Sequence, residues 1–129
     1  MRKISLTTAL VVAALPSAAL AEKWLPVGIT ANQDQFSVDF SSIRTMPSGH
    51  RRVWVKVDFG KPSDAGDTGY KTFSELDCRE GRSRTLSAAF FANDTITRKS
   101  NKPRDWQDVA RGSVFENVLY AVCFGRLPR

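Results

Sequence analysis

The sequence has few of the residues on which most enzyme active sites depend. It contains a single histidine, His50, so a metal site built on paired histidines is excluded. The chain also lacks the G-x-S-x-G turn of nucleophilic hydrolases and the glycine-rich loops that hold nucleotide phosphates. His50 stands beside Arg51 and Arg52 at an expected turn, where a solvated structural role is favoured over catalysis. We therefore expect neither a metal nor another cofactor.

Carboxylates are the remaining candidates for catalysis. Asp64 and Asp67 fall in an expected flexible loop, and Glu75 and Asp77 alternate along an expected strand. A glycosidase needs two carboxyl groups roughly 5 to 9 Å apart, and nothing in this spacing brings such a pair together. The sequence therefore predicts a protein that is not an enzyme.

Hydrophobic runs long enough to span a membrane are absent as well. Residues 1–21 combine Arg2 and Lys3, an apolar run over residues 9–15, and small residues at 19–21, the pattern of a secretory signal peptide. The apolar run is too short for about 30 Å of hydrocarbon, which needs roughly 20 residues, so cleavage is favoured over a retained anchor. The next residue is Glu22, not the cysteine of a lipid-anchored envelope protein.

We therefore expect an exported single domain over residues 22–129, with no transmembrane segment and no lipid anchor after cleavage. Its expected location is the periplasm or the outside of the cell.

Six segments alternate apolar and polar residues with a period of two, which is typical of β-strands. They are residues 24–30, 35–40, 51–59, 70–78, 83–92 and 95–99. The clearest is 51–59, in which Val53, Val55 and Val57 share one face and Trp54 lies on the other. Residues 60–69 are rich in glycine, proline, serine and aspartate, which predicts an exposed loop.

The period changes to that of a helix near the C-terminus. Ser113 and Glu116 form a capping box, apolar residues then recur at helical spacing, and Gly125 suits the helix end. Residues 100–112 are polar and irregular apart from Trp106, which we expect to plug the end of the core. The order predicts an α+β fold: an antiparallel meander of about six strands with a C-terminal α-helix packed on one face.

The expected domain contains only two cysteines, Cys78 and Cys123. In an oxidising compartment such a pair most simply forms one disulfide, which would close a loop of about 45 residues and contribute on the order of 4 kcal/mol. In the predicted fold Cys123 on the helix can reach Cys78 at a strand end. Two free buried thiols are the alternative.

Basic residues concentrate in one part of the chain. The full chain has a net charge of +6, and loss of the two basic residues of the leader leaves +4. Between residues 79 and 104, seven basic side chains stand against two acidic ones. Four of the seven are expected on neighbouring strands: Arg82, Arg84, Arg98 and Lys99. Their charges can sum into one patch that attracts anionic partners in a salt-dependent way. A solvated surface that only keeps the protein soluble is the alternative.

Trp54 completes the candidate binding surface. It points away from the valine face, so it either packs on the second face of the sheet or contacts a partner. Nucleic acid is disfavoured as that partner, because the chain is expected to be exported.

The order of several short segments resembles the surface-adhesin protein E family of bacterial envelope proteins. The segments lie between Trp24 and Phe124: VDFSSIR at 38–44, VWV at 53–55, YKT at 70–72, DC at 77–78, RTL at 84–86, WQDV at 106–109, GS at 112–113, and Cys123. The resemblance implies a six-stranded antiparallel sheet with a helix against it and a bridge between Cys78 and Cys123. It also implies an adhesin that binds host extracellular-matrix and plasma proteins and can dimerise. The chain departs from such adhesins by lacking a lipid-attachment cysteine, and by Arg111 where proline is expected.

The leading hypothesis is a non-catalytic secreted or envelope binding domain, whose basic face contacts a host or envelope protein or an anionic polymer. A second hypothesis is a periplasmic inhibitor of a lysozyme or peptidase that inserts the loop from Lys61 to Gly69. The net charge of +4 makes a basic lysozyme an awkward target. A third is an envelope structural subunit, in which exposed edge strands permit a homodimer.

Overall fold

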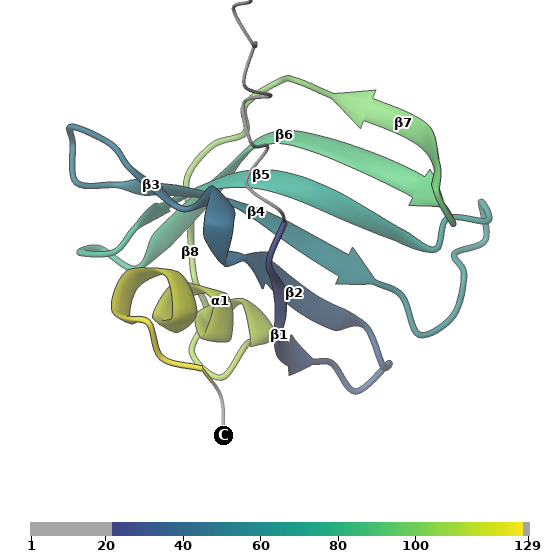
Figure 1. The fold of residues 1–129 in the computed structure, drawn as a ribbon, viewed down its shortest axis with the longest axis horizontal. Helices are drawn as coiled ribbons and strands as arrows, with labels where there is room; N and C mark the ends of the chain where they lie inside the picture. Colours follow the sequence, from purple (N-terminus) through teal and green to yellow (C-terminus); the bar gives the residue numbers. More distant parts are fainter. Residues whose placement is uncertain (1–21, 128–129) are drawn as a thin grey trace, which may run out of the picture.

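The computed structural model describes residues 22–127, so the expected leader lies outside the described residues. In the described part, eight strands form one antiparallel sheet and one α-helix packs against it (Figure 1). The strands are β1 (Trp24–Ile29), β2 (Gln35–Asp39), β3 (Arg44–Thr45), β4 (Arg51–Asp58), β5 (Gly69–Asp77), β6 (Arg82–Ala92), β7 (Thr95–Ser100) and β8 (Gln107–Asp108). A 3₁₀ turn, η1 (Phe40–Ser42), follows β2, and the helix is α1 (Val114–Phe124).

The six longer strands form a meander in the order β1-β2-β4-β5-β6-β7. Each pairs antiparallel with its neighbour, β3 pairs with the start of β4, and β8 pairs with the start of β6. The predicted six-stranded antiparallel sheet with a C-terminal helix is therefore confirmed. β3 and β8 are additions, and neither was predicted because two residues are too short to show alternation.

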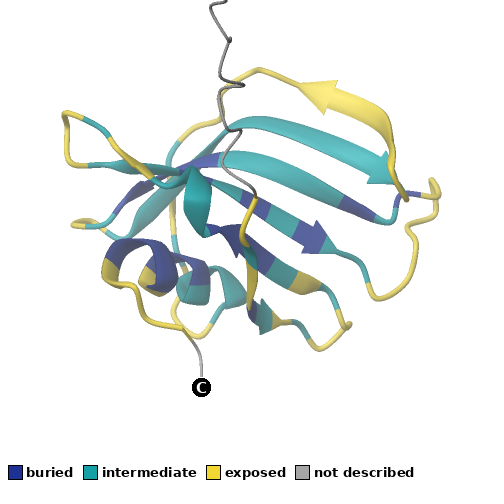
Figure 2. Ribbon diagram, viewed as in Figure 1, coloured by how far each residue is buried: buried dark blue, intermediate teal, exposed yellow. Residues whose placement is uncertain are grey.

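The core lies between α1 and the β1-β2-β4 part of the sheet, because the apolar stripes of both elements meet there. Val53, Val55 and Val57 are at most 1% exposed, and so are Val118 and Val122 of the helix. Figure 2 shows buried residues in β2, β4 and α1, whereas β7 is exposed along its whole length. The helix therefore covers only half of its face of the sheet.

The helix begins and ends where the sequence predicts. The Ser113 side chain accepts a hydrogen bond from the backbone N–H of Glu116, and Gly125 ends the helix in the left-handed conformation with φ of 64°. Glu116 accepts from the N–H of Gly112 rather than from that of Ser113, so the capping box is formed on one side only. The helix crosses β1 at Gly28, where an added Cβ would lie 2.9 Å from side-chain atoms of Asn117 and Val114.

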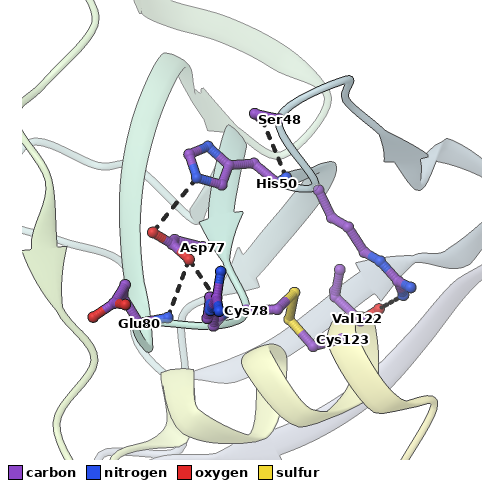
Figure 3. Close-up of a disulfide and its surroundings, with 9 residues drawn as sticks. Ser48, His50, Asp77, Cys78, Glu80, Val122 and Cys123 are labelled. Carbon is purple, nitrogen blue, oxygen red and sulfur yellow. Dashed lines mark hydrogen bonds and ion pairs between the residues drawn. A yellow bond between two sulfur atoms is a disulfide. The ribbon is translucent and has the colours of Figure 1, made fainter.

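A disulfide fixes the C-terminal part of the helix to the sheet. Cys78, directly after β5, is bonded to Cys123 in the last turn of α1, with 5.7 Å between the Cα atoms (Figure 3). The predicted bridge is confirmed, and no described cysteine is free. A second link lies close by, because the Arg51 guanidinium donates a hydrogen bond of 2.6 Å to the carbonyl of Val122.

Candidate functional site

The four basic residues predicted to form one patch lie on neighbouring strands but at two separate places. Arg82 and Arg84 occupy the start of β6, where it pairs with the end of β5. Arg98 and Lys99 lie on β7, which pairs with the end of β6. From Arg84 to Ala89, the residue opposite Lys99, the strand rises roughly 15 Å. The two places are therefore separate surfaces.

At the first place, buried carboxylates neutralise the arginines. Glu75 is 3% exposed and accepts hydrogen bonds from Nε and Nη2 of Arg84, at 3.1 and 2.8 Å, and from Nε of Arg52 at 2.7 Å. Asp77 is 5% exposed and accepts from Nη2 of Arg82 at 3.2 Å. We call these five residues, together with His50, the carboxylate cluster. Its arginines already have partners within the fold.

His50 lies between the two carboxylates of this cluster. Its Nδ1 is 3.4 Å from Glu75 Oε2, and its Nε2 is 3.5 Å from Asp77 Oδ2. Figure 3 shows the ring directed at Asp77. The side chain is 29% exposed, so it is partly solvated and also packed against the two carboxylates. The pairing of β4 with β5 brings the start of β4 beside these carboxylates, and the sequence around His50 contains no signal for that pairing.

Trp106 covers the carboxylate cluster instead of plugging the core. Its ring meets the His50 ring edge-on at 5.0 Å, and the guanidiniums of Arg84 and Arg82 lie 4.8 and 5.6 Å from its centroid. It does not belong to the core cluster of the described residues, so the expected role was wrong. The reason is β8, which pairs with the start of β6 and places the preceding residue over the arginines.

The carboxylate cluster is poorly suited to acid–base catalysis. Burial raises the pKa of Glu75, but hydrogen bonds from its two arginine partners outweigh burial and hold the pKa below its usual range. Burial likewise raises the pKa of Asp77, but the backbone N–H of Glu80, the Arg82 side chain and the nearby histidine together lower it. A general base works best when its pKa is near the working pH. These carboxylates are weak bases with a structural role.

The second basic place is an exposed edge of the sheet. Residues 95–104, here called the basic edge, comprise β7 and the extended segment after it, and all of them are exposed (Figure 2). They contain no acidic residue. Their basic residues are Arg98, Lys99, Lys102 and Arg104. Because β7 ends the strand order, its outer side has no strand neighbour among the described residues.

Two residues of the basic edge are anchored to the loop before β5. Nη2 of Arg98 donates to Asp67 Oδ2 at 2.6 Å, and its guanidinium lies 4.3 Å from the Phe90 ring. Thr97 donates to the other oxygen of Asp67 at 2.8 Å. Hydrogen bonds from Thr97 and Arg98 lower the pKa of Asp67 against the opposing effect of burial. Asp67 is 2% exposed, so the predicted exposed loop is fixed at this residue.

The other three basic side chains are free to meet a partner. Among residues 22–127, Lys99, Lys102 and Arg104 are in no salt bridge. A cavity of about 480 Å³ lies at the C-terminal part of the basic edge, and Lys102 and Arg104 line it together with Asp105. Of the four residues predicted to form one patch, Arg98 and Lys99 thus belong to the basic edge, and Arg82 and Arg84 belong to the carboxylate cluster.

A groove borders the basic edge on the face of the sheet opposite α1. Two adjoining cavities of about 690 and 450 Å³ form it, and both are lined by Lys71, Ala89 and Ile96. Lys99 and Trp54 line the second cavity. Trp54 was predicted either to pack on the second face of the sheet or to contact a partner. It packs there, since its ring stacks on Phe73 with 5.1 Å between the centroids. It also lines the groove, where a partner could reach it.

The charge of this groove is mixed. The ammonium groups of Lys56 and Lys71 lie 4.9 and 5.5 Å from the ring of Trp24, which suits cation–π contact. Lys56 also pairs with Asp58 at 3.8 Å, and Glu22 lines the second cavity. The groove therefore has less attraction for a polyanion than the basic edge does.

The described residues include no group of three or more histidine, cysteine, aspartate or glutamate side chains placed to hold a metal ion. No helix within residues 22–127 has the length and apolar character needed to cross a membrane.

Comparison with known proteins gives one informative result. The family model for surface-adhesin protein E matches residues 24–124, from the first residue of β1 to the last residue of α1. No curated protein and no solved structure matches the chain. The family match covers both the basic edge and the carboxylate cluster.

Proposed function

The chain belongs to the surface-adhesin protein E family, and on this premise we propose that it is an exported, non-catalytic binding protein that holds an anionic partner on its basic edge. The partner class is an acidic protein or an anionic polymer of the cell envelope or of a host matrix. Family membership supports a binding protein of the adhesin type. The choice of surface comes from the charges of the described residues.

One observation carries this choice. The ten consecutive exposed residues of the basic edge contain no carboxylate. Three of its four basic side chains, those of Lys99, Lys102 and Arg104, are in no salt bridge among the described residues. Positive charge at an exposed surface steers negatively charged partners into encounter, and salt weakens this effect. Arg82 and Arg84, by contrast, have their charges taken up by Asp77 and Glu75. The basic edge is therefore the better candidate for contact.

The test is elution from a heparin column in a salt gradient, because heparin is a soluble polyanion. The double variant Lys99→Glu/Lys102→Glu should elute at lower salt than the wild type. We expect about tenfold weaker binding, because two attractive contacts with the polyanion become repulsive. The matched control is Arg79→Glu/Arg111→Glu, which makes the same change in net charge at exposed residues outside the basic edge. The control should elute close to the wild type. Equal losses in both double variants would show that net charge alone governs binding.

Export is part of the same proposal, because a binding protein of the envelope must leave the cytoplasm. The leader over residues 1–21 supports it through its basic start, short apolar run and small residues at the cut. Intact-mass measurement of the protein from fractionated cells tests it. We expect a chain that begins at Glu22 and has two hydrogens fewer than the reduced form. A mass that includes Met1 would contradict export by this route.

A further inference from the structure

We infer that the basic edge takes its partner by strand addition: an extended acidic segment of a protein pairs with the outer side of β7, and an apolar side chain of that segment meets Ile96. The inference rests on the proposed function, because it specifies how the basic edge binds. It narrows the partner from any polyanion to a polypeptide.

The backbone of β7 provides the first part of the case. β7 has six residues, all exposed, which in extended form span about 20 Å. Its register with β6 runs from Ala88 to Ala92 with one bulge, because Phe90 pairs with Arg98 and Phe91 with Ile96, which leaves Thr97 as the additional residue. No other strand among residues 22–127 pairs with it. Its outer N–H and C=O groups also make no hydrogen bond with the backbone of a turn or loop in that range. An unpaired edge of this kind is a template for another strand.

The side chains of β7 provide the second part. Ile96 is 52% exposed and lines both cavities of the groove, and Lys99 lines one of them. Arg98 is turned the other way, towards Asp67 and the Phe90 ring. Successive side chains of an added strand point to alternate faces. A partner would therefore place an apolar residue beside Ile96 and an acidic residue beside Lys99, both on the face of the groove. Arg98 already has Asp67 as its partner.

The same charges disfavour two other occupants. If a second copy of the chain paired through its own β7, basic side chains would stand close to one another, and like charges directly opposite are destabilising. A polysaccharide brings negative charge but has no peptide groups to continue the ladder. An acidic polypeptide satisfies both the charge of the basic edge and its backbone.

The experiment uses anisotropy titrations of the full mature chain against a short fluorescent peptide of glutamate and valine, with both residue types on each face of the extended peptide. Two further peptides have the same sequence but are N-methylated on every odd-numbered or on every even-numbered residue. In an extended strand the N–H groups of these two sets point to opposite edges. Strand addition therefore predicts that one methylated peptide loses at least about tenfold in affinity, while the other binds like the parent.

The outcomes separate the inference from the proposed function. If all three peptides bind equally and salt weakens each, charge alone holds the partner; the inference is then overturned while the basic edge remains the site. If the parent peptide does not bind although heparin does, the inference is likewise overturned. If neither the peptide nor heparin binds, the proposed function fails as well.

A side-chain variant adds an independent check. Ile96→Ser should weaken the parent peptide about fivefold through lost apolar contact, and it should leave heparin elution unchanged. The matched control is Ile29→Ser, which removes an isoleucine that is 55% exposed at the end of β1. Sedimentation must show a monomer at the concentrations used. A dimer broken by Ile96→Ser would mean that a second copy occupies this edge, against the inference.

Discussion

Glu75 and Arg84 face each other across β5 and β6, and the guanidinium donates two hydrogen bonds to the same carboxylate oxygen. Glu75 is almost completely shielded from water, so its charge depends on Arg84 and Arg52. A buried carboxylate without such partners costs several kcal/mol. This pair therefore stabilises the β5-β6 hairpin at this end.

Replacing Glu75 by glutamine should destabilise the protein by about 2 kcal/mol, because two arginines lose their counter-charge. The loss is moderate because the side chains of Arg52 and Arg84 are 37% and 30% exposed, so water offsets part of it. Urea unfolding measures the change. Asp58→Asn is the control: Asp58 is half exposed and 3.8 Å from Lys56, so its loss should cost less than about 1 kcal/mol. If both variants lose the same stability, the burial of Glu75 does not increase the contribution of its ion pairs.

Stability should fall in acid. The pKa values of Glu75 and Asp77 are lowered in the fold, from ordinary values of 4.5 and 3.8. Their contribution is complete above these values, where folded and unfolded chains are both ionised. It is lost as the pH falls, because the unfolded chain takes up protons first. Urea titrations from neutral pH to pH 3 should show a fall that begins near pH 4.5. In Glu75→Gln the free energy of unfolding should fall less steeply with decreasing pH. An unchanged slope would show that other carboxyl groups cause the loss of stability.

Removal of the disulfide should cost about 4 kcal/mol, because the bridge joins residues 45 positions apart and restricts the unfolded chain. The variant Cys78→Ala/Cys123→Ala, unfolded in urea, measures this loss. A reducing agent should lower the stability of the wild type by a similar amount and leave the double variant unchanged. A wild type insensitive to complete reduction would contradict this.

The contact of α1 with β1 should be sensitive to one methyl group. In Gly28→Ala the new Cβ would lie 2.9 Å from atoms of Asn117 and Val114, so the helix must shift. We expect a loss of about 1–3 kcal/mol, typical of overpacking. The same substitution in an Asn117→Ala/Val114→Ala background should cost clearly less, since both obstructing side chains are shortened. If the cost is the same in both backgrounds, the strain arises elsewhere.

Strands with one buried face were predictable from the sequence, and very short strands were not. The alternation in residues 51–59 placed β4 to within one residue, because its valines face the core and its polar residues do not. β3 and β8 have two residues each and are held by their pairing with longer strands. That pairing is a long-range contact with no local pattern, so the sequence could not show it.

For the site, the sequence identified basic strands but not their partners. A signal was present, because Glu75 and Asp77 stand before the turn that Arg82 and Arg84 follow, and pairing across this hairpin sets opposite charges face to face. The role of His50 was beyond prediction, since it depends on how β4 aligns with β5. The long exposure of β7 was also hidden, because a solvated edge strand can show the same alternation as a covered one.

The strand β6 connects the carboxylate cluster with the basic edge. Its first residues hold the arginines that neutralise β5, and its last residues support the edge proposed to meet a partner. Leu86 lies between them, at an irregularity where Phe73 pairs with Ser87 and Ser74 pairs with Thr85, so Leu86 itself has no partner on β5. A bulge of this kind bends its strand and increases the local twist, so Leu86 sets the relative orientation of the carboxylate cluster and the basic edge.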